Sequence, residues 1–119
     1  MIKGIGVDII ELGRVRKSLS RTHRLVDRVL TVKETEYFNG LSSEKRKIEF
    51  LAGRFAAKEA YAKALGTGIG EISFIDIEIL PNEFGAPEIS VNSNVKDSIF
   101  VSISHSEAYA VAQVIIEKV

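Results

Sequence analysis

Four charged side chains stand in a segment of this chain that is otherwise apolar or small. The segment runs from 53 to 66, and its charged residues are Arg54, Lys58, Glu59 and Lys63. At about 100° per residue, a helix here is apolar around most of its circumference, so most of it should be buried. Burying a charge costs free energy unless the charge is paired or used. These four residues are therefore the first candidates for chemistry.

A second carboxylate, Asp8, lies in an apolar segment near the start of the chain. Two carboxylates that the fold brings together suit a hard cation such as Mg²⁺, provided that substrate phosphate supplies further ligands. Lys63, one turn beyond Glu59, could neutralise such a phosphate. It could equally form an ordinary i,i+4 ion pair with Glu59, and spacing alone favours that simpler role.

His105 stands beside serines between two apolar segments. A histidine in this setting is most often a turn residue, although at the end of a strand it could face a cleft and contact a phosphate. A glycine-rich stretch, 66–70, has three glycines in five residues. Such a loop lets the backbone approach a ligand or another chain closely.

Basic residues predominate between 11 and 28, where the sequence has six of them and only two acidic residues. Five are spaced three or four apart and share one face if the segment stays helical; these are Arg14, Lys17, Arg21, Arg24 and Arg28. An acidic partner could dock there, and a solvated helix face is an equally good interpretation. Nucleic acid is a weaker candidate, because the formal net charge is zero and no aromatic residues are interleaved with the arginines.

Composition favours one small globular domain over residues 1–119, with 45% hydrophobic residues to build a core. We expect a cytoplasmic protein that does not enter the membrane, because no apolar run reaches a membrane span and the first residues lack a signal-peptide layout. The chain has no cysteine, which excludes disulfides and thiolate metal sites.

The positioning elements can be predicted from hydrophobic periodicity and from capping signals. Residues 2–10 read as a strand that carries Asp8, and Thr31 with Glu34 forms a capping box for a short helix that Gly40 closes. Ser42 or Ser43 can cap a long helix that ends at Gly66. Alanines every fourth residue, from 52 to 64, should let a neighbouring backbone pack closely on it.

Later segments favour strands: 75–79, 87–91 after a turn at 81–85, and a hairpin of 99–104 with 109–117 that puts His105 at its turn end. Helices that precede strands, without βαβ alternation, predict an α+β domain. We expect a mainly antiparallel sheet packed with one long helix and several short ones.

Three separate motifs together resemble a known family. They are Gly4-Ile-Gly-Val-Asp-Ile-Ile-Glu11, Phe50-Leu-Ala-Gly-Arg-Phe-Ala-Ala-Lys-Glu-Ala60 continuing to Gly70, and Val101-Ser-Ile-Ser-His-Ser106. In order and spacing they are similar to those of the small bacterial holo-(acyl-carrier-protein) synthases, the short class of 4'-phosphopantetheinyl transferases. The resemblance covers residues 2 to about 117, and its middle motif is the most specific.

This resemblance implies Mg²⁺-dependent transfer of 4'-phosphopantetheine from coenzyme A to a serine of apo acyl carrier protein, in support of fatty acid biosynthesis. It implies Asp8 and Glu59 as metal ligands and Lys63 beside the phosphates. It also implies nucleotide contacts and a carrier-binding surface. The nucleotide positions are Arg46, Arg54, Gly66, Gly68, Gly85, Pro87 and His105, and the carrier-binding positions are Arg14, Arg21, Arg24 and Arg28.

Members of the family are homotrimers with active sites between subunits, so the resemblance also implies that state. Three other classes stay open from the residues themselves. A coenzyme A-binding module would not need the carboxylates, an interaction domain for an acidic helix would not need Lys63, and a phosphohydrolase would need no acceptor protein. Lys58 has no assigned role at this stage.

Overall fold

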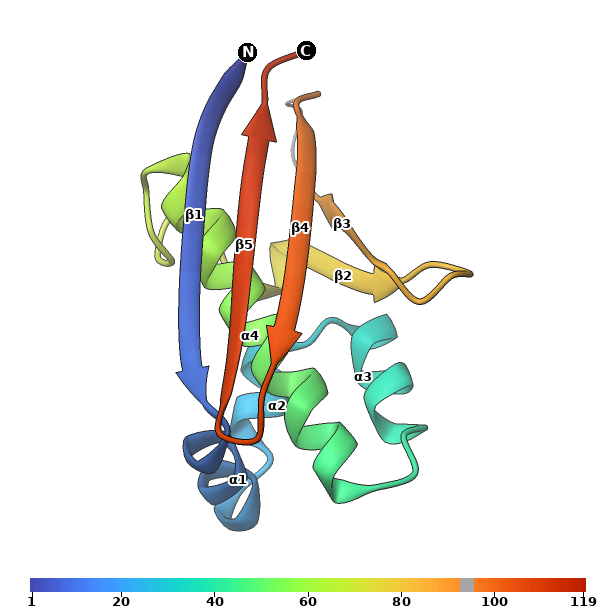
Figure 1. Cartoon of the computed structure of the whole chain (residues 1–119). Helices are drawn as coiled ribbons and strands as arrows, with labels where there is room; N and C mark the ends of the chain where they lie inside the picture. Colours follow the sequence, from blue (N-terminus) through green and yellow to red (C-terminus); the bar gives the residue numbers. More distant parts are fainter. Residues whose placement is uncertain (93–95) are drawn as a thin grey trace.

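Five strands and four α-helices make up the computed structural model, which describes residues 1–92 and 96–119 (Figure 1). In chain order they are β1 (Ile2–Glu11), α1 (Leu12–Arg21), α2 (Arg24–Val29), α3 (Val32–Asn39), α4 (Glu44–Leu65), a 3₁₀ turn (Phe74–Asp76), β2 (Ile77–Pro81), β3 (Pro87–Val91), β4 (Ser98–His105) and β5 (Tyr109–Glu117). None of these helices is long and apolar enough to cross a membrane. The predicted α+β class is confirmed.

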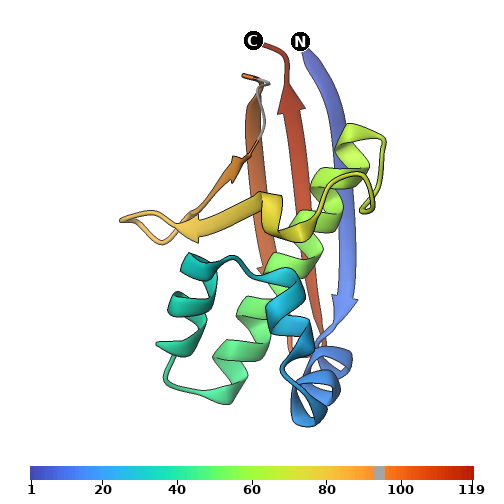
Figure 2. The same cartoon turned by 180° about the vertical axis from the view of Figure 1, so that it is seen from behind.

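Strands β1, β5 and β4 form an antiparallel sheet in that order, and β2 pairs with β3 in a second, two-stranded antiparallel sheet. Helix α4 crosses one face of the larger sheet, and the short helices gather around its N-terminal half (Figure 2). The opposite face of that sheet is bare in Figure 1. The contact between α4 and the sheet is the frame on which the candidate residues are placed.

Glycines on the inner face of β1 let α4 approach the sheet very closely. A Cβ at Gly6 would collide with the carbonyl oxygen of Ala60, and one at Gly4 with that of Ala64. The alanines of α4 are fully buried or nearly so at these positions. The predicted close packing along the alanine side is confirmed, and it explains why Ile5, Val7 and Ile9 of β1 face outward.

Local capping sets the ends of α3 and α4. The hydroxyl of Thr31 accepts from the backbone N–H of Glu34 (3.2 Å), and the Glu34 carboxylate accepts from the backbone N–H of Thr31 (2.8 Å). Ser43, rather than Ser42, caps α4 by accepting from the N–H of Arg46 (3.2 Å). Gly66 ends α4 in the left-handed region, at φ 83°. Both predicted helices are confirmed.

Two predictions are corrected. The predicted strand at 75–79 begins only at Ile77, because the Asp76 carboxylate accepts from the backbone N–H of Ser73 (3.0 Å) and closes a 3₁₀ turn that leaves Ile75 exposed. The basic segment does not stay helical throughout, since α1 ends at Arg21 and α2 begins at Arg24. The five basic residues therefore belong to two short helices.

Candidate active site

Asp8 and Glu59 line one pocket of about 450 Å³, which we call the carboxylate pocket. Asp8 comes from the inner face of β1 and Glu59 from the middle of α4, so the close helix–sheet packing brings the two carboxylates together. Arg14 of α1 and Arg28 of α2 line the same pocket. Sequence reasoning predicted the carboxylates and the arginines separately, and the structure joins them.

Lys63 pairs with Asp8 rather than with Glu59. Its Nζ donates to Oδ1 of Asp8 (3.0 Å) and to the carbonyl oxygen of Val7 (3.0 Å). The ammonium is therefore held against Asp8, one of the two carboxylates of the pocket, while half of the lysine side chain stays exposed. The ordinary i,i+4 pair is not among the ion pairs of the described residues, so the simpler role that spacing favoured is wrong.

The carboxylate pocket has the electrostatic character of a cation site. Partial burial, and then the like charge of Asp8, raise the pKa of Glu59, while Lys63 and Arg28 oppose the rise. A divalent cation between the carboxylates would relieve that repulsion. Within residues 1–92 and 96–119, no three histidine or acidic side chains cluster well enough to hold a metal by themselves. The pair thus fits Mg²⁺ that takes its remaining ligands from phosphate and water.

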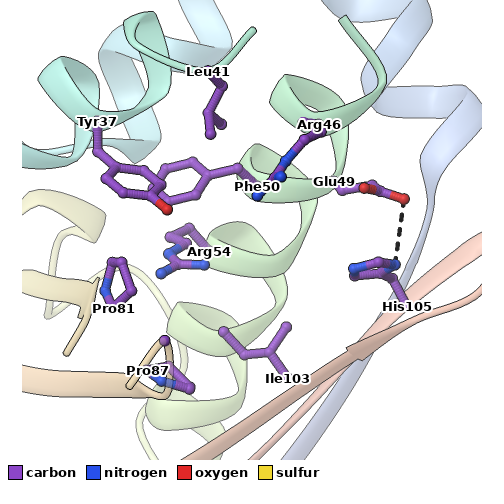
Figure 3. Close-up of a pocket in the computed structure, with 11 residues that line it drawn as sticks. Tyr37, Leu41, Arg46, Glu49, Phe50, Arg54, Pro81, Pro87, Ile103 and His105 are labelled. Atoms are coloured by element: carbon purple, nitrogen blue, oxygen red, sulfur yellow. Dashed lines mark ion pairs between the residues drawn. The ribbon is translucent and has the colours of Figure 1, made fainter. Parts of the chain in front are cut away.

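A second pocket, of about 260 Å³, collects five of the residues that the resemblance assigned to the nucleotide (Figure 3). These are Arg46, Arg54, Gly85, Pro87 and His105. We call this cavity the nucleotide pocket. Its other walls are Tyr37 and Leu41 from the α3 region, Glu49 and Phe50 from α4, Pro81 from β2 and Ile103 from β4.

Arg54 is the most buried cation in this pocket, at 9% exposure. Its Nε donates to the carbonyl oxygen of Ile79 (3.0 Å), and its guanidinium lies 4.1 Å from the centre of the Phe50 ring. Burial lowers the pKa of Arg54 to about 10, while the charge of Glu34 and then that of Tyr37 oppose the change. The guanidinium is thus fixed on two sides and suits a bound anion.

His105 belongs to a strand and lines the nucleotide pocket, so it is not a residue of the turn. It ends β4, and its Nδ1 lies 3.3 Å from Oε2 of Glu49 on α4, the contact drawn as a dashed line in Figure 3. The carboxylate holds the imidazole at the rim of the nucleotide pocket. His105 and Arg46 remain exposed enough to meet a ligand.

The remaining predicted residues lie outside both pockets. Gly66 and Gly68 adopt positive φ values of 83° and 72° in the loop after α4. Arg21 and Arg24 are exposed at the break between α1 and α2. The carboxylate pocket and the nucleotide pocket share no lining residue, so the structure does not join the metal and nucleotide residues of one chain into a single cavity.

Sequence reasoning missed several walls of the nucleotide pocket. Phe50 stands four residues before Arg54, a spacing that places both on one helix face, so this contact could have been predicted from the sequence. Tyr37, whose ring is tilted against that of Phe50 with ring centres 5.0 Å apart, comes from α3 and gave no such signal. Glu34 was recognised only as a capping residue, although its side chain is fully buried.

Comparison with known proteins agrees with the fold. Residues 4–114 match the family model of the 4'-phosphopantetheinyl transferase superfamily. A holo-(acyl-carrier-protein) synthase of Anoxybacillus flavithermus is 60% identical over 119 residues, covering 99% of this chain and 98% of the relative. That of Oceanobacillus iheyensis is 53% identical over 117 residues, covering 98% of each chain.

Solved structures give the same result. The crystal structure of a holo-(acyl-carrier-protein) synthase from Bacillus anthracis, in complex with CoA (3',5'-ADP), has a TM-score of 0.91 and 48% identity and covers 100% of this chain and 99% of its own. The enzyme from Neisseria meningitidis has a TM-score of 0.86 at 36% identity, with 99% and 100% covered. The chain therefore belongs to the 4'-phosphopantetheinyl transferase superfamily, within its holo-(acyl-carrier-protein) synthases.

Proposed function

We propose that residues 1–119 form one domain that transfers 4'-phosphopantetheine from coenzyme A to a serine of apo acyl carrier protein. The observation that carries this proposal is the carboxylate pocket, in which Asp8 and Glu59 lie beside two arginines and Asp8 pairs with Lys63. Near-full-length relatives with this name support it, as does the related structure that contains CoA (3',5'-ADP). We further propose that the chain supports fatty acid biosynthesis and acts in the cytoplasm.

The reaction joins a serine oxygen to the phosphorus nearer pantetheine. The bond from that phosphorus to the bridging oxygen breaks, adenosine 3',5'-bisphosphate leaves with that oxygen, and the serine proton is released. Phosphoryl transfer asks a protein mainly for positioning and charge neutralisation. The nucleophile comes from the partner, which is why the chain needs no catalytic triad of its own.

Asp8 and Glu59 would hold Mg²⁺. When bound, Mg²⁺ supplies positive charge to the pyrophosphate oxygens during transfer. Lys63, anchored on Asp8, places a fixed ammonium beside that carboxylate and so would favour negative charge on the transferred group. Its half-exposed stem leaves the ammonium accessible to a phosphate oxygen.

The nucleotide pocket would hold the adenosine bisphosphate part of coenzyme A. Arg54 and Arg46 supply positive charge, and His105 adds a ring nitrogen at the rim. Gly85 and Pro87 shape the wall formed by the turn between β2 and β3. Gly66 and Gly68 have no side chain, so the backbone of the loop after α4 could lie directly against the ligand.

The exposed arginines of α1 and α2 would receive the acyl carrier protein through acidic residues on its surface. Arg14 and Arg28 stand beside the carboxylates, while Arg21 and Arg24 extend the positive surface away from them. A carrier docked there presents its serine to the carboxylate pocket. Opposite charges on the two surfaces speed association and make it sensitive to salt.

A homotrimer with active sites between subunits completes the proposal. Its support is twofold: the metal and nucleotide residues of one chain line separate pockets, and the outer sheet face exposes a row of large apolar side chains. In that row, Ile5 of β1 pairs with Ile115 of β5, which pairs with Phe100 of β4. One copy would supply Asp8, Glu59 and Lys63, and its neighbour Arg54 and His105.

Mass spectrometry of apo acyl carrier protein tests this function. After incubation with the chain, coenzyme A and Mg²⁺, the carrier should gain the mass of one phosphopantetheine group. The gain should vanish with chelator and fall at least about a hundredfold in rate in Asp8→Ala or Glu59→Ala, because charge stabilisation is lost. No gain on any apo carrier would refute the transferase, and phosphate release without a carrier would instead indicate a phosphohydrolase.

A further inference from the structure

A single buried carboxylate joins three elements that wall the nucleotide pocket. Oε1 of Glu34 on α3 accepts from the backbone N–H of Thr31 (2.8 Å) and from Nζ of Lys58 on α4 (2.6 Å). Oε2 accepts from the backbone N–H of Ile79 on β2 (2.7 Å). The side chains of Glu34 and Lys58 are both fully buried. Such a network is costly unless every member is satisfied, and here it is.

Lys58 neutralises this carboxylate and ties it to a further element. Its Nζ also donates to the carbonyl oxygen of Val29 at the end of α2 (2.6 Å). Burial lowers the pKa of Lys58, and the charge and hydrogen bond of Glu34 oppose that fall. A buried ion pair of this kind adds little net stability compared with well-packed apolar residues. Its value lies in fixing one arrangement of the four elements.

The arrangement bears directly on Arg54. Residue Ile79 links the two side chains, because its N–H is held by Glu34 and its carbonyl oxygen accepts from Nε of Arg54 (3.0 Å). Glu34 therefore fixes the backbone to which the guanidinium is anchored. Arg54 and the other walls contributed by α3, α4 and β2 project into one cavity in Figure 3.

We propose that Glu34 is a positioning residue for the proposed reaction: through Ile79 it aims Arg54 into the nucleotide pocket, and Lys58 keeps the carboxylate in place. This role rests on the proposed function, in which Arg54 meets an anionic group of coenzyme A. It assigns a function to Lys58, whose position in the middle of an apolar helix face was unexplained by the sequence. Neither Glu34 nor Lys58 is among the residues that line the nucleotide pocket.

The test compares Glu34→Gln with a control that loses stability elsewhere. A glutamine amide cannot accept from all three donors, so β2 should shift and the dissociation constant for adenosine 3',5'-bisphosphate should rise about tenfold. The KM for coenzyme A should rise alike, while kcat at saturation stays within about threefold. Val114→Ala, at a buried core position of β5, should lower stability but leave both constants unchanged.

A double-mutant cycle identifies the route. In an Arg54→Gln background, Glu34→Gln should add little further weakening, because both changes remove the same aimed guanidinium. Full additivity would overturn the proposal. If Glu34→Gln does not fold, Glu34→Gln with Lys58→Met removes both buried charges and should fold. That variant should also bind the nucleotide about tenfold more weakly, and wild-type affinity in it would overturn the proposal.

The outcomes separate this inference from the function on which it rests. If Arg54→Gln weakens nucleotide binding and Glu34→Gln does not, only the positioning role fails. If Arg54→Gln itself leaves binding unchanged, the proposed nucleotide role of Arg54 fails, and the positioning role with it. Loss of carrier modification with intact nucleotide binding would instead refute the transferase alone.

Discussion

Gly6 shows how one missing Cβ sets the geometry of the carboxylate pocket. A Cβ there would overlap the carbonyl oxygen of Ala60, a backbone atom that cannot move aside. Gly6→Ala should therefore lower the free energy of unfolding by about 3 kcal/mol or more, measured by chemical denaturation. At Gly13, in α1, an added methyl group would have no neighbouring atom within 4 Å, so Gly13→Ala is the matched control.

The control should be neutral or raise stability by up to about 1 kcal/mol, since alanine is the better helix former. Gly6→Ala should also reduce carrier modification in the fraction that stays folded, because Asp8 would be pushed away from Glu59. An unchanged unfolding free energy in Gly6→Ala would show that α4 does not pack on β1 as described.

Individual contacts differ in how far the sequence could predict them. The Asp8 and Glu59 carboxylates could be selected because charges in apolar segments are costly, and the structure places both in one pocket. The partner of Lys58 could not be selected, since Glu34 lies 24 residues away on another helix. Periodicity reports which face a residue occupies, and it carries no information about which distant group meets that face.

At the scale of the elements, the N-cap of α4 separates two neighbouring serines. Ser43 accepts from the N–H of Arg46, whereas Ser42 makes no cap and is exposed. Ser43→Ala should cost about 1 kcal/mol of stability, and Ser42→Ala should cost almost nothing. Thermal unfolding of the two variants side by side measures the difference. Equal effects would place the start of α4 elsewhere.

Elements with local signals were predicted well, and elements set by distant contacts less so. Helix α4 and the β4–β5 hairpin have caps, periodicity and a short connection, all of which can be read along the chain. The pairing of β1 with β5 joins the two ends of the chain, and no local signal encodes it. The 3₁₀ turn before β2 was missed because Ile75 continues the alternation of Ile77 and Ile79 while pointing into solvent.

For the whole molecule, the exposed apolar side chains on the outer sheet face are the feature that would be buried by association with a partner. Phe100 lies on this face and is 56% exposed, and Ile75, on the 3₁₀ turn away from it, is also 56% exposed. Phe100→Asp should convert the proposed trimer to monomers in sedimentation velocity, because a carboxylate would be buried at the proposed interface. Ile75→Asp, equal in exposure and in charge, should leave the proposed trimer intact.

Monomers of Phe100→Asp should also lose transferase activity, because the residues proposed to hold the metal and those proposed to hold the nucleotide would no longer meet. If the purified wild type sediments as a monomer and is active, the interfacial arrangement is wrong.

Subunit mixing tests the divided site without disturbing the interface. Glu59→Ala and Arg54→Ala chains, each deficient alone at low coenzyme A, should regain activity when unfolded together and refolded in equal amounts. In a ring of like interfaces, about one site in four then combines an intact Glu59 with an intact Arg54 from its neighbour. Absence of any recovery would place both residues in one chain's site.

Because the Lys58 side chain is fully buried, the rate of its chemical modification can measure how often the fold opens. An amine-reactive mass tag needs an uncharged, accessible amine, so it should label half-exposed Lys63 well before Lys58, which it reaches only when α4 parts from α3. The rate at which Lys58 acquires the tag would then give the frequency with which α4 separates from α3. A bound nucleotide should slow that labelling by favouring the closed form.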